Sequence, residues 1–246
     1  MSGHSHYSTI KRTKEAKDAV KGRIFSKHAK AIAIAIKEGG SSDPAINAKL
    51  RDAINQAKSD NLPKSNIERL LNKASEMGDL KEATYEGFAP GGVAVMVKVV
   101  TDNKNRTAQE IKNLFEKVGG SLASPGAVSF NFELKGLIVV KKDKDPDDQI
   151  LKLIDLGAED VEDVGNEIEV YVGPNKTSEA KEKIEKGGFE VVSFSQIQKP
   201  KSTVDINNPD MVKKILTFLE TLENHDDVQS VSANLDIPLK LTEKIK

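Results

Sequence analysis

The 246-residue sequence contains no cysteine and no tryptophan. Without cysteine, a disulfide framework, cysteine-ligated zinc, an iron–sulfur cluster and thiol catalysis are excluded. No apolar run approaches the roughly 18 residues that a membrane-spanning helix needs. The N-terminal stretch is positively charged but has no apolar segment behind it, so it does not resemble a secretory signal. We therefore expect a cytoplasmic protein with no membrane partner.

Net charge is also nearly absent, at −1, and taken alone this argues against a polyanionic partner. The distribution of charge along the chain instead indicates a polyanionic partner. Positions 1–78 hold 15 basic and 8 acidic side chains, whereas positions 79–246 hold 22 basic and 30 acidic ones. The N-terminal segment 1–78 thus has a net charge of +7, and the remaining segment 79–246, called the acidic body below, has a net charge of −8. Because phosphate binding depends on local charge, this asymmetry indicates a nucleic-acid partner.

Apolar residues at helical spacing predict three helices in residues 1–78. Residues 31–36 alternate alanine and isoleucine and could form a strand, but alanine is a poor strand former, so a helix is favoured. Gly39-Gly40 is expected to end this first helix, Asp43-Pro44 to begin the second, and Pro63 to begin the third. The apolar face of the first helix consists of Phe25, Ala29, Ile32 and Ile36.

Beyond residue 78 the pattern changes to strands alternating with helices. Residues 134–197 show the complete order of a ferredoxin-like βαββαβ domain. Its expected elements are strand 137–141, helix 147–156, strands 160–164 and 167–172, helix 177–186 and strand 189–194. The flanking parts each supply one βαβ half. These halves are strand 93–100, helix 107–118 and strand 128–132, then strand 203–206, helix 209–223 and strand 228–235.

Joining the two halves gives a second βαββαβ domain into which the first is inserted. The predicted fold class is therefore α+β, with an N-terminal three-helix domain followed by two ferredoxin-like domains, one inserted into the other. The corresponding domains are 1–78, a discontinuous domain at 79–133 plus 198–240, and the insert at 134–197. One long mixed sheet is the alternative.

No pattern of catalytic residues is present. The motifs GxxxxGK[ST] and GxGxxG are absent, and the glycines of 87–92 lead into a strand, which predicts a turn rather than a phosphate site. The four histidines show no metal-binding spacing such as HExxH. The acidic runs 143–148 and 159–163 are typical of solvated loops, and the first also caps a helix. We predict a protein that is not an enzyme and has no cofactor or metal site.

Aromatic residues are few, with eight Phe and three Tyr. A ferredoxin-like sheet can bind RNA where aromatic side chains project from its central strands. Phe130 and Phe132 share one predicted strand face, but the other central strands carry valine and isoleucine, and the (K/R)-G-(F/Y)-(G/A)-F signature is absent. Packing in the core is the favoured role for both residues.

The basic N-terminal segment is the strongest functional signal. Lysines on a solvated helix face usually alternate with acids, but no acid follows Asp18 until Glu38. A merely solvated face is the alternative, and the unbroken run of cations favours contact with nucleic-acid phosphates. The predicted contacts are Lys11, Arg12, Lys14, Lys17, Lys21, Arg23, Lys27 and Lys30.

The loop 101–107 is rich in hydrogen-bonding side chains. One interpretation is an Asx-turn in which Asn105 caps the following helix. The other is a second contact surface for a partner or an RNA backbone. The residues of that surface would be Asn103, Lys104, Asn105 and Arg106.

Several motifs along nearly the whole chain resemble the YebC/PmpR family. They are Gly3-His4-Ser5, Ile10-Lys11, the run Gly22 to Lys27, Asn61-Leu62-Pro63-Lys64, Asn66-Ile67-Glu68-Arg69, Tyr85-Glu86-Gly87, Pro90-Gly91-Gly92, the run Thr101 to Thr107, Gly119-Gly120, Pro125-Gly126, Gly188-Phe189-Glu190 and Asp226-Asp227-Val228-Gln229.

The resemblance implies a three-domain cytoplasmic protein without known catalytic activity, interpreted as DNA-binding in bacteria. The family also includes the mitochondrial translational activator of cytochrome oxidase, and bacterial members are interpreted as ribosome-associated factors that relieve stalling at proline-rich stretches. We therefore expect a DNA-binding transcription regulator that acts as a monomer. The alternative is a ribosome-associated translation factor that binds ribosomal RNA.

Overall fold

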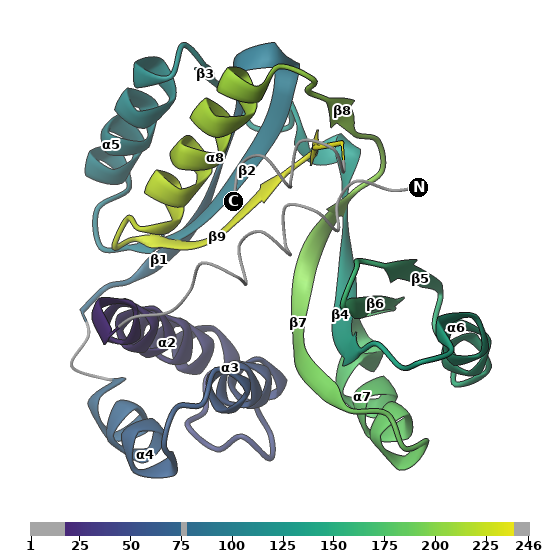
Figure 1. Ribbon diagram of the computed structural model, residues 1–246. Helices are drawn as coiled ribbons and strands as arrows, with labels where there is room; N and C mark the ends of the chain where they lie inside the picture. Colours follow the sequence, from purple (N-terminus) through teal and green to yellow (C-terminus); the bar gives the residue numbers. More distant parts are fainter. Residues whose placement is uncertain (1–17, 75–77, 239–246) are drawn as a thin grey trace. The chain divides into compact units, whose positions relative to one another are not determined.

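The computed structural model describes residues 18–74 and 78–238 (Figure 1). These residues form two compact units. The first unit consists of the described residues of 18–130 with 206–233, and the second of 131–205 with 234–238. Each unit contains one four-stranded sheet. Within the described ranges, no helix has both the length and the apolar character needed to cross a bilayer.

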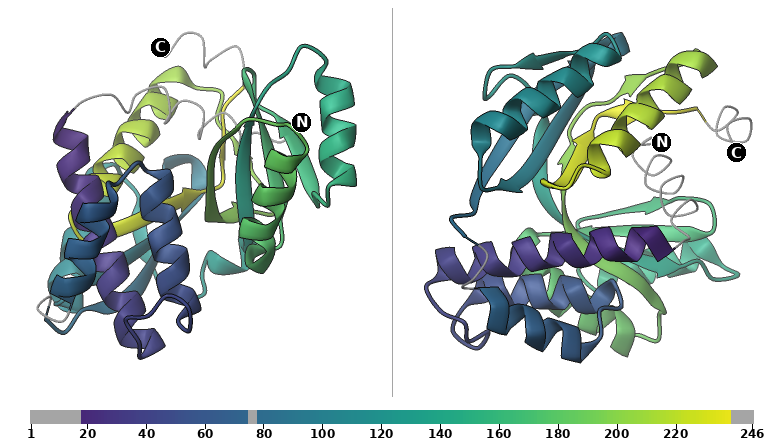
Figure 2. Two further views of the ribbon diagram at one scale, coloured as in Figure 1. Left: turned by 90° about the horizontal axis from the view of Figure 1, so that it is seen from below. Right: turned by 90° about the vertical axis from the view of Figure 1, so that its left-hand side faces the viewer.

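Three helices begin the first unit, as the sequence predicts: α2 (Asp18–Gly39), α3 (Ala48–Ser59) and α4 (Lys64–Lys73). In the right-hand view of Figure 2, α2 runs alongside the other two helices, and Ile32, Leu50 and Leu70 are buried in their shared core.

The start of α3 differs from the prediction. Asn47 caps α3 by accepting a hydrogen bond from the Leu50 amide at 3.1 Å. Asp43 instead accepts from the Ala45 amide at 2.9 Å and closes a local turn, so the helix begins at Ala48 rather than at Pro44.

The first unit also contains a sheet of strand order β3-β1-β2-β9, in which all neighbours are antiparallel. Two helices, α5 and α8, lie side by side against it (Figure 1). Phe115 of α5 meets Phe218 of α8 edge to face, with 4.9 Å between ring centroids. A Cβ at Gly87 would lie 2.6 Å from the Phe115 ring, so this close approach of α5 to β1 requires glycine. The elements are β1 (Lys81–Ala89), β2 (Val93–Thr101), α5 (Lys104–Lys117), β3 (Ser121–Ala123), α8 (Pro209–Glu223) and β9 (Val228–Ala233).

The strands observed in this part of the chain differ from those predicted for the discontinuous domain. Residues 81–89, which the periodicity did not indicate as a strand, form β1 and pair with β2 across the turn Pro90–Gly92. The turn itself is as predicted, and Gly91 adopts a φ of 78° that favours glycine. The predicted strand 203–206 is reduced to β8 (Val204–Asp205), which pairs in parallel with β10 (Leu235–Asp236) outside the four-stranded sheets.

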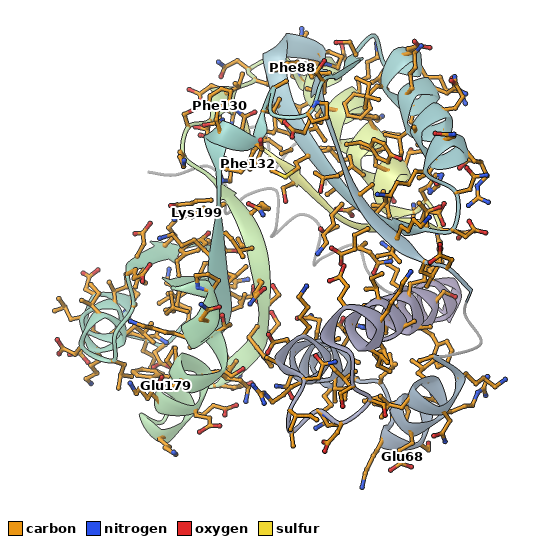
Figure 3. All side chains as sticks on the ribbon, turned by 180° about the vertical axis from the view of Figure 1, so that it is seen from behind. Glu68, Phe88, Phe130, Phe132, Glu179 and Lys199 are labelled. Atoms are coloured by element: carbon orange, nitrogen blue, oxygen red, sulfur yellow. The ribbon has the colours of Figure 1, made fainter. Side chains whose placement is uncertain are left out.

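The predicted strand 128–132 was also wrong. Its place is taken by a turn and a 3-10 helix, Ser129–Asn131, and β4 begins only at Phe132. Phe130 is consequently 72% exposed, whereas Phe132 is buried as expected (Figure 3). The two rings therefore do not share a strand face.

The second unit contains the predicted ferredoxin-like domain. Its strand order is β5-β6-β4-β7 with antiparallel neighbours, the order that a βαββαβ chain gives. One apolar core includes Ile138, Leu153 and Ile184 from the sheet and both helices. The elements are β4 (Phe132–Lys141), α6 (Pro146–Asp155), β5 (Asp160–Asp163), β6 (Glu167–Val172), α7 (Thr177–Lys186) and β7 (Val191–Pro200).

The predicted fold class is confirmed, because N-terminal helices are followed by antiparallel sheets with helices. The division into domains 1–78, 79–133 plus 198–240, and 134–197 stays a prediction.

The two acidic runs of the second unit have different roles. Asp145 caps α6 as expected for 143–148. The run 159–163 is less solvated than predicted, because Lys199, only 8% exposed, donates to Asp160 at 2.6 Å and lies 3.0 Å from Glu162. The Lys199 ammonium also lies 3.5 Å from the centre of the Tyr171 ring, a cation–π contact.

The carboxylate of Glu86 explains the irregular segment after β3. Glu86 on β1 accepts hydrogen bonds from the amides of Gly126, Val128 and Ser129 at 2.9, 2.7 and 2.9 Å. Burial alone would raise the pKa of Glu86, but these amide donors outweigh burial and lower it. One buried charge thus holds a turn where the local sequence favours a strand.

We expect Glu86→Gln to lower the free energy of unfolding by about 2 kcal/mol, because an amide group then faces amide donors. Hydrogen exchange at Gly126, Val128 and Ser129 should accelerate. Glu82→Gln on the same strand, which removes only a partly exposed ion pair with Lys98, should change stability by less than about 0.5 kcal/mol. Unchanged exchange in Glu86→Gln would contradict the role of this carboxylate.

Candidate nucleic-acid interface

Helix α2 carries the predicted phosphate-binding cations that the structure describes. Lys21 and Arg23 lie in its first turns, and Arg23 is half-buried. Four further predicted contacts, Lys11, Arg12, Lys14 and Lys17, lie outside the described residues.

Lys27 and Lys30 bind within the protein instead of standing free. The Lys27 ammonium donates to the carbonyl of Glu223, at the end of α8, at 2.8 Å. Lys30 donates to the carbonyl of Asp226 at 3.0 Å and to the carboxylate of Asp227 at 2.6 Å. Lys27 therefore connects α2 to the end of α8, and Lys30 connects it to the loop between α8 and β9. Sequence alone could not reveal this, because the acceptors lie near the opposite end of the chain.

Asp227 is the centre of this network and is only 5% exposed. Its Oδ1 accepts from Lys30, and its Oδ2 accepts from the Arg106 guanidinium at 2.9 Å and from the Thr107 hydroxyl at 2.7 Å. Its backbone carbonyl accepts from the Val100 amide at 2.8 Å. A single residue thereby joins α2, the end of β2, the first turns of α5 and the loop before β9.

The charge of Asp227 is stabilised by its donors. Burial alone would raise the pKa of Asp227, but hydrogen bonds from Lys30, Thr107 and Arg106 outweigh burial and hold the pKa far below its ordinary value. The aspartate is therefore ionised at neutral pH, and its negative charge balances its cationic partners, Lys30 and Arg106.

These internal hydrogen bonds largely account for the many hydrogen-bonding side chains in the loop 101–107. Asn103, not Asn105, caps α5 by accepting from the Arg106 amide at 3.1 Å, so the predicted cap was displaced by two residues. Arg106 binds Asp102 at 2.9 Å as well as Asp227. Lys104 and Asn105 are exposed. The second contact surface of Asn103 to Arg106 stays a prediction, with two of its four side chains held by the protein itself.

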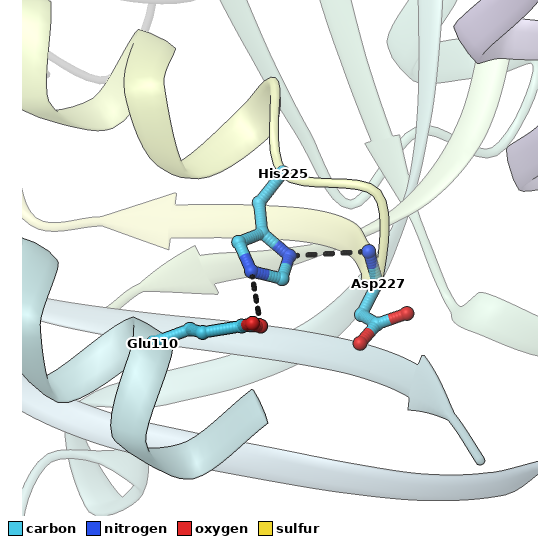
Figure 4. Close-up of side chains that lie close together, drawn as sticks. All are labelled: Glu110, His225 and Asp227. Carbon is cyan, nitrogen blue, oxygen red and sulfur yellow. Dashed lines mark hydrogen bonds and ion pairs between the residues drawn. The ribbon is translucent and has the colours of Figure 1, made fainter. Parts of the chain in front are cut away.

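His225 connects to this network from the same loop (Figure 4). Its Nδ1 accepts from the Asp227 amide at 3.1 Å, and its Nε2 lies 3.0 Å from the Glu110 carboxylate, which assigns the proton to Nε2. Glu110, His225 and Asp227 are the one group of three metal-ligating side chains that the described residues bring together. Both ring nitrogens already make hydrogen bonds, so this arrangement leaves His225 no lone pair for a metal ion.

A second histidine is also paired across the sequence. His28, on α2, is buried, and its Nε2 lies 2.8 Å from the carboxylate of Asp60, which follows α3. The spacing of the histidines in sequence could not indicate either carboxylate partner. His4 and His6 lie outside the described residues.

A hollow of about 650 Å³ lies over the network. Two cations, Lys30 and Arg106, contribute to its lining, together with four acids and His225. The acids are Asp102, Glu110, Asp226 and Asp227. The charge of this lining is unfavourable for phosphate, and no nucleophile in it is paired with a base.

Comparison with known protein families gives matches to both parts of the chain. The model of the TACO1/YebC protein N-terminal domain matches residues 5–77, and that of the TACO1/YebC second and third domain matches residues 80–235. The chain belongs to the TACO1/YebC family. This confirms the resemblance seen in the sequence motifs.

Relatives in this family match the chain along its whole length. A protein of Dictyoglomus thermophilum is 44% identical over 100% of both chains, and one of Thermotoga maritima is 44% identical over 100% of this chain and 98% of its own. Both are named "Probable transcriptional regulatory protein". The crystal structure of a conserved hypothetical protein from Aquifex aeolicus is 43% identical, covers 92% of this chain and 94% of its own, and superposes with a TM-score of 0.80.

We expect Asp227→Asn to lower the free energy of unfolding by about 2 kcal/mol at pH 7, because Lys30 and Arg106 lose their shared charge. The folded-state pKa of Asp227 is lowered, so the unfolded chain takes up the proton first. The stabilisation is therefore complete above about pH 5 and is lost as pH falls below about 4. Urea unfolding across this range should show the two proteins converging in acid.

Asp226→Asn is the matched control. Asp226 is exposed, and its backbone carbonyl rather than its carboxylate accepts from Lys30. This variant should remain within about 0.5 kcal/mol of the parent. Equal effects at Asp226 and Asp227 would contradict the central role of Asp227.

Proposed function

We propose that this protein is a non-enzymatic, nucleic-acid-binding regulator of gene expression that grips the phosphates of duplex DNA through its N-terminal helical region. The observation that carries the proposal is the division of charge, +7 over positions 1–78 and −8 over the rest. Arginine and lysine on one segment release counterions from DNA on binding, which supplies affinity without base contacts. The names of the curated relatives support a regulatory role.

The contacts of Lys27 and Lys30 narrow the proposed interface. The two ammonium groups have acceptors at the end of α8 and in the loop that follows it, so their release to phosphate would break internal bonds. The proposed phosphate contacts are therefore those that precede Phe25. They are Lys11, Arg12, Lys14, Lys17, Lys21 and Arg23.

The negative charge of residues 79–246 favours one orientation of the protein on the DNA duplex. Repulsion between this net charge of −8 and the DNA backbone would keep the body away from the duplex while the basic segment binds. We propose that the protein acts in the cytoplasm, as a monomer. This would leave the sheets and their helices free to contact other partners.

If these six cations each neutralise one phosphate, the logarithm of the DNA association constant should fall against the logarithm of salt concentration with a slope of about −5. Fluorescence anisotropy with a labelled duplex, measured from low to physiological salt, gives this slope. A flat dependence would reject phosphate binding by the basic segment.

Reversing three of these charges tests where the phosphates bind. We expect the variant Lys17→Glu, Lys21→Glu and Arg23→Glu to weaken DNA binding by about 100-fold or more and to make the salt slope shallower by about 3. The control reverses the same number of charges in the inserted domain, at Lys144, Lys176 and Lys186. Its binding should stay close to that of the parent, and equal losses in both variants would point to total charge rather than to this segment.

Crosslinking in cells followed by sequencing distinguishes the two nucleic acids. The proposal predicts recovery of DNA fragments by the parent and their loss in the charge-reversed variant. Recovery of ribosomal RNA, together with co-sedimentation on large ribosomal subunits, would replace DNA with the ribosome and favour the translation-factor alternative.

A further inference from the structure

A groove of about 360 Å³ runs between α5 and α8 in the first unit. Three apolar side chains line it: Leu114 from α5, Val118 directly after α5, and Phe218 from α8. The volume lies within the range of pockets that accept small ligands or a few side chains. The Asp227 network lies outside this groove, and the proposed phosphate contacts also lie elsewhere in the chain.

Lysines surround this apolar floor. Lys117, Lys213 and Lys214 line the groove, with Asp210 as the single acid among the lining residues. All three lysines are exposed, and none forms an ion pair with another described residue. The groove therefore combines an apolar floor with a rim of net positive charge.

This arrangement differs from the lysine-rich surface of α7. On α7, Lys181 pairs with Glu185 and Lys183 with Glu179, each at 2.7 Å. Lysines spaced in this way along a helix satisfy their charge locally. The cations beside the α5–α8 groove lack such partners, so their charge is available to a ligand.

The apolar side chains of the groove indicate which kind of negatively charged ligand it can bind. A nucleic-acid backbone offers no aliphatic chain to Leu114 and Val118, and Phe218 is only 2% exposed, so it presents no ring for base stacking. An amphipathic helix places apolar residues at three- and four-residue intervals into a groove and directs its flanking side chains to the rim. Acidic flanks would then meet the three lysines.

The ends of this chain do not have the complementary charge. Residues 1–17 carry four basic side chains and one acid, and residues 239–246 carry three lysines and one glutamate. Either end would bring positive charge to a positive rim. Charge complementarity therefore favours an acidic segment of a partner protein over either of these two segments.

We propose that the α5–α8 groove binds an acidic amphipathic helix of a partner protein. Leu114 and Val118, which lie over the buried Phe218, receive the apolar residues of that helix, and Lys117, Lys213 and Lys214 pair with its carboxylates. The inference goes beyond the proposed function because it assigns a protein-binding surface that is independent of the basic N-terminal segment.

A displayed library of 16-residue helical peptides provides the test. Each peptide keeps leucine at one face and varies glutamate, lysine and glutamine at the flanking positions, and the bait is the full-length protein. Enriched peptides should carry net negative flanks. Their affinity should fall about tenfold or more in the variant Lys117→Glu, Lys213→Glu and Lys214→Glu, and also in Leu114→Asp. Both variants should retain the parent's circular dichroism and DNA affinity.

A control variant makes the same charge change on α3 and α4, at Lys58, Lys64 and Lys73, and should bind the enriched peptides like the parent. The proposal is overturned if no peptide is enriched on the parent over the variant with reversed groove charges, or if the enriched peptides are basic. It is also overturned if reversing the groove lysines abolishes DNA binding, because these lysines would then serve nucleic acid. If the N-terminal charge reversal did not weaken DNA binding, the proposed function would fail, but the result of this peptide-binding test would not change.

Discussion

One buried carboxylate, that of Asp227, joins the separate parts of the first unit. It accepts from Lys30 on α2 and from Arg106 and Thr107 on α5, while its backbone carbonyl accepts from the end of β2. The apolar contact beside it is small, with Ala33 and Val100 among its buried residues. These hydrogen bonds to a charged carboxylate therefore help to hold α2 against the sheet of this unit, and their donors come from segments far from Asp227 in the sequence.

This constraint divides the cations of α2 into two groups. Lys27 and Lys30 serve the interior of the unit, whereas the cations before Phe25 form the proposed contact with phosphate. A single helix thus combines a structural role with a proposed functional one, and the division follows position along the helix, because Lys27 and Lys30 contact the end of α8 and the loop that follows it. The charge over positions 1–78 is consequently larger than the charge available to a nucleic acid.

Local patterns predicted most of the fold. The three helices, the ferredoxin-like order of elements over residues 132–200 and α8 followed from apolar periodicity and from the glycines and prolines that end or begin helices. The failures have physical causes. Strand β1 was missed because Glu86 and Gly87 interrupt its apolar alternation. The segment before β4 was taken for a strand because the carboxylate that holds its amides comes from β1, far back in the sequence.

The sequence by itself determined the partition of charge, the helix boundaries set by glycine and the order of elements in the insert, because each depends on composition or on neighbours within a few residues. Tertiary structure decided which lysines bind internally, which carboxylates accompany His28 and His225, and where the α5–α8 groove forms. These features depend on residues that are far apart in the chain. Their spacing in sequence carries no signal, since only folding brings a donor and its acceptor within hydrogen-bond distance.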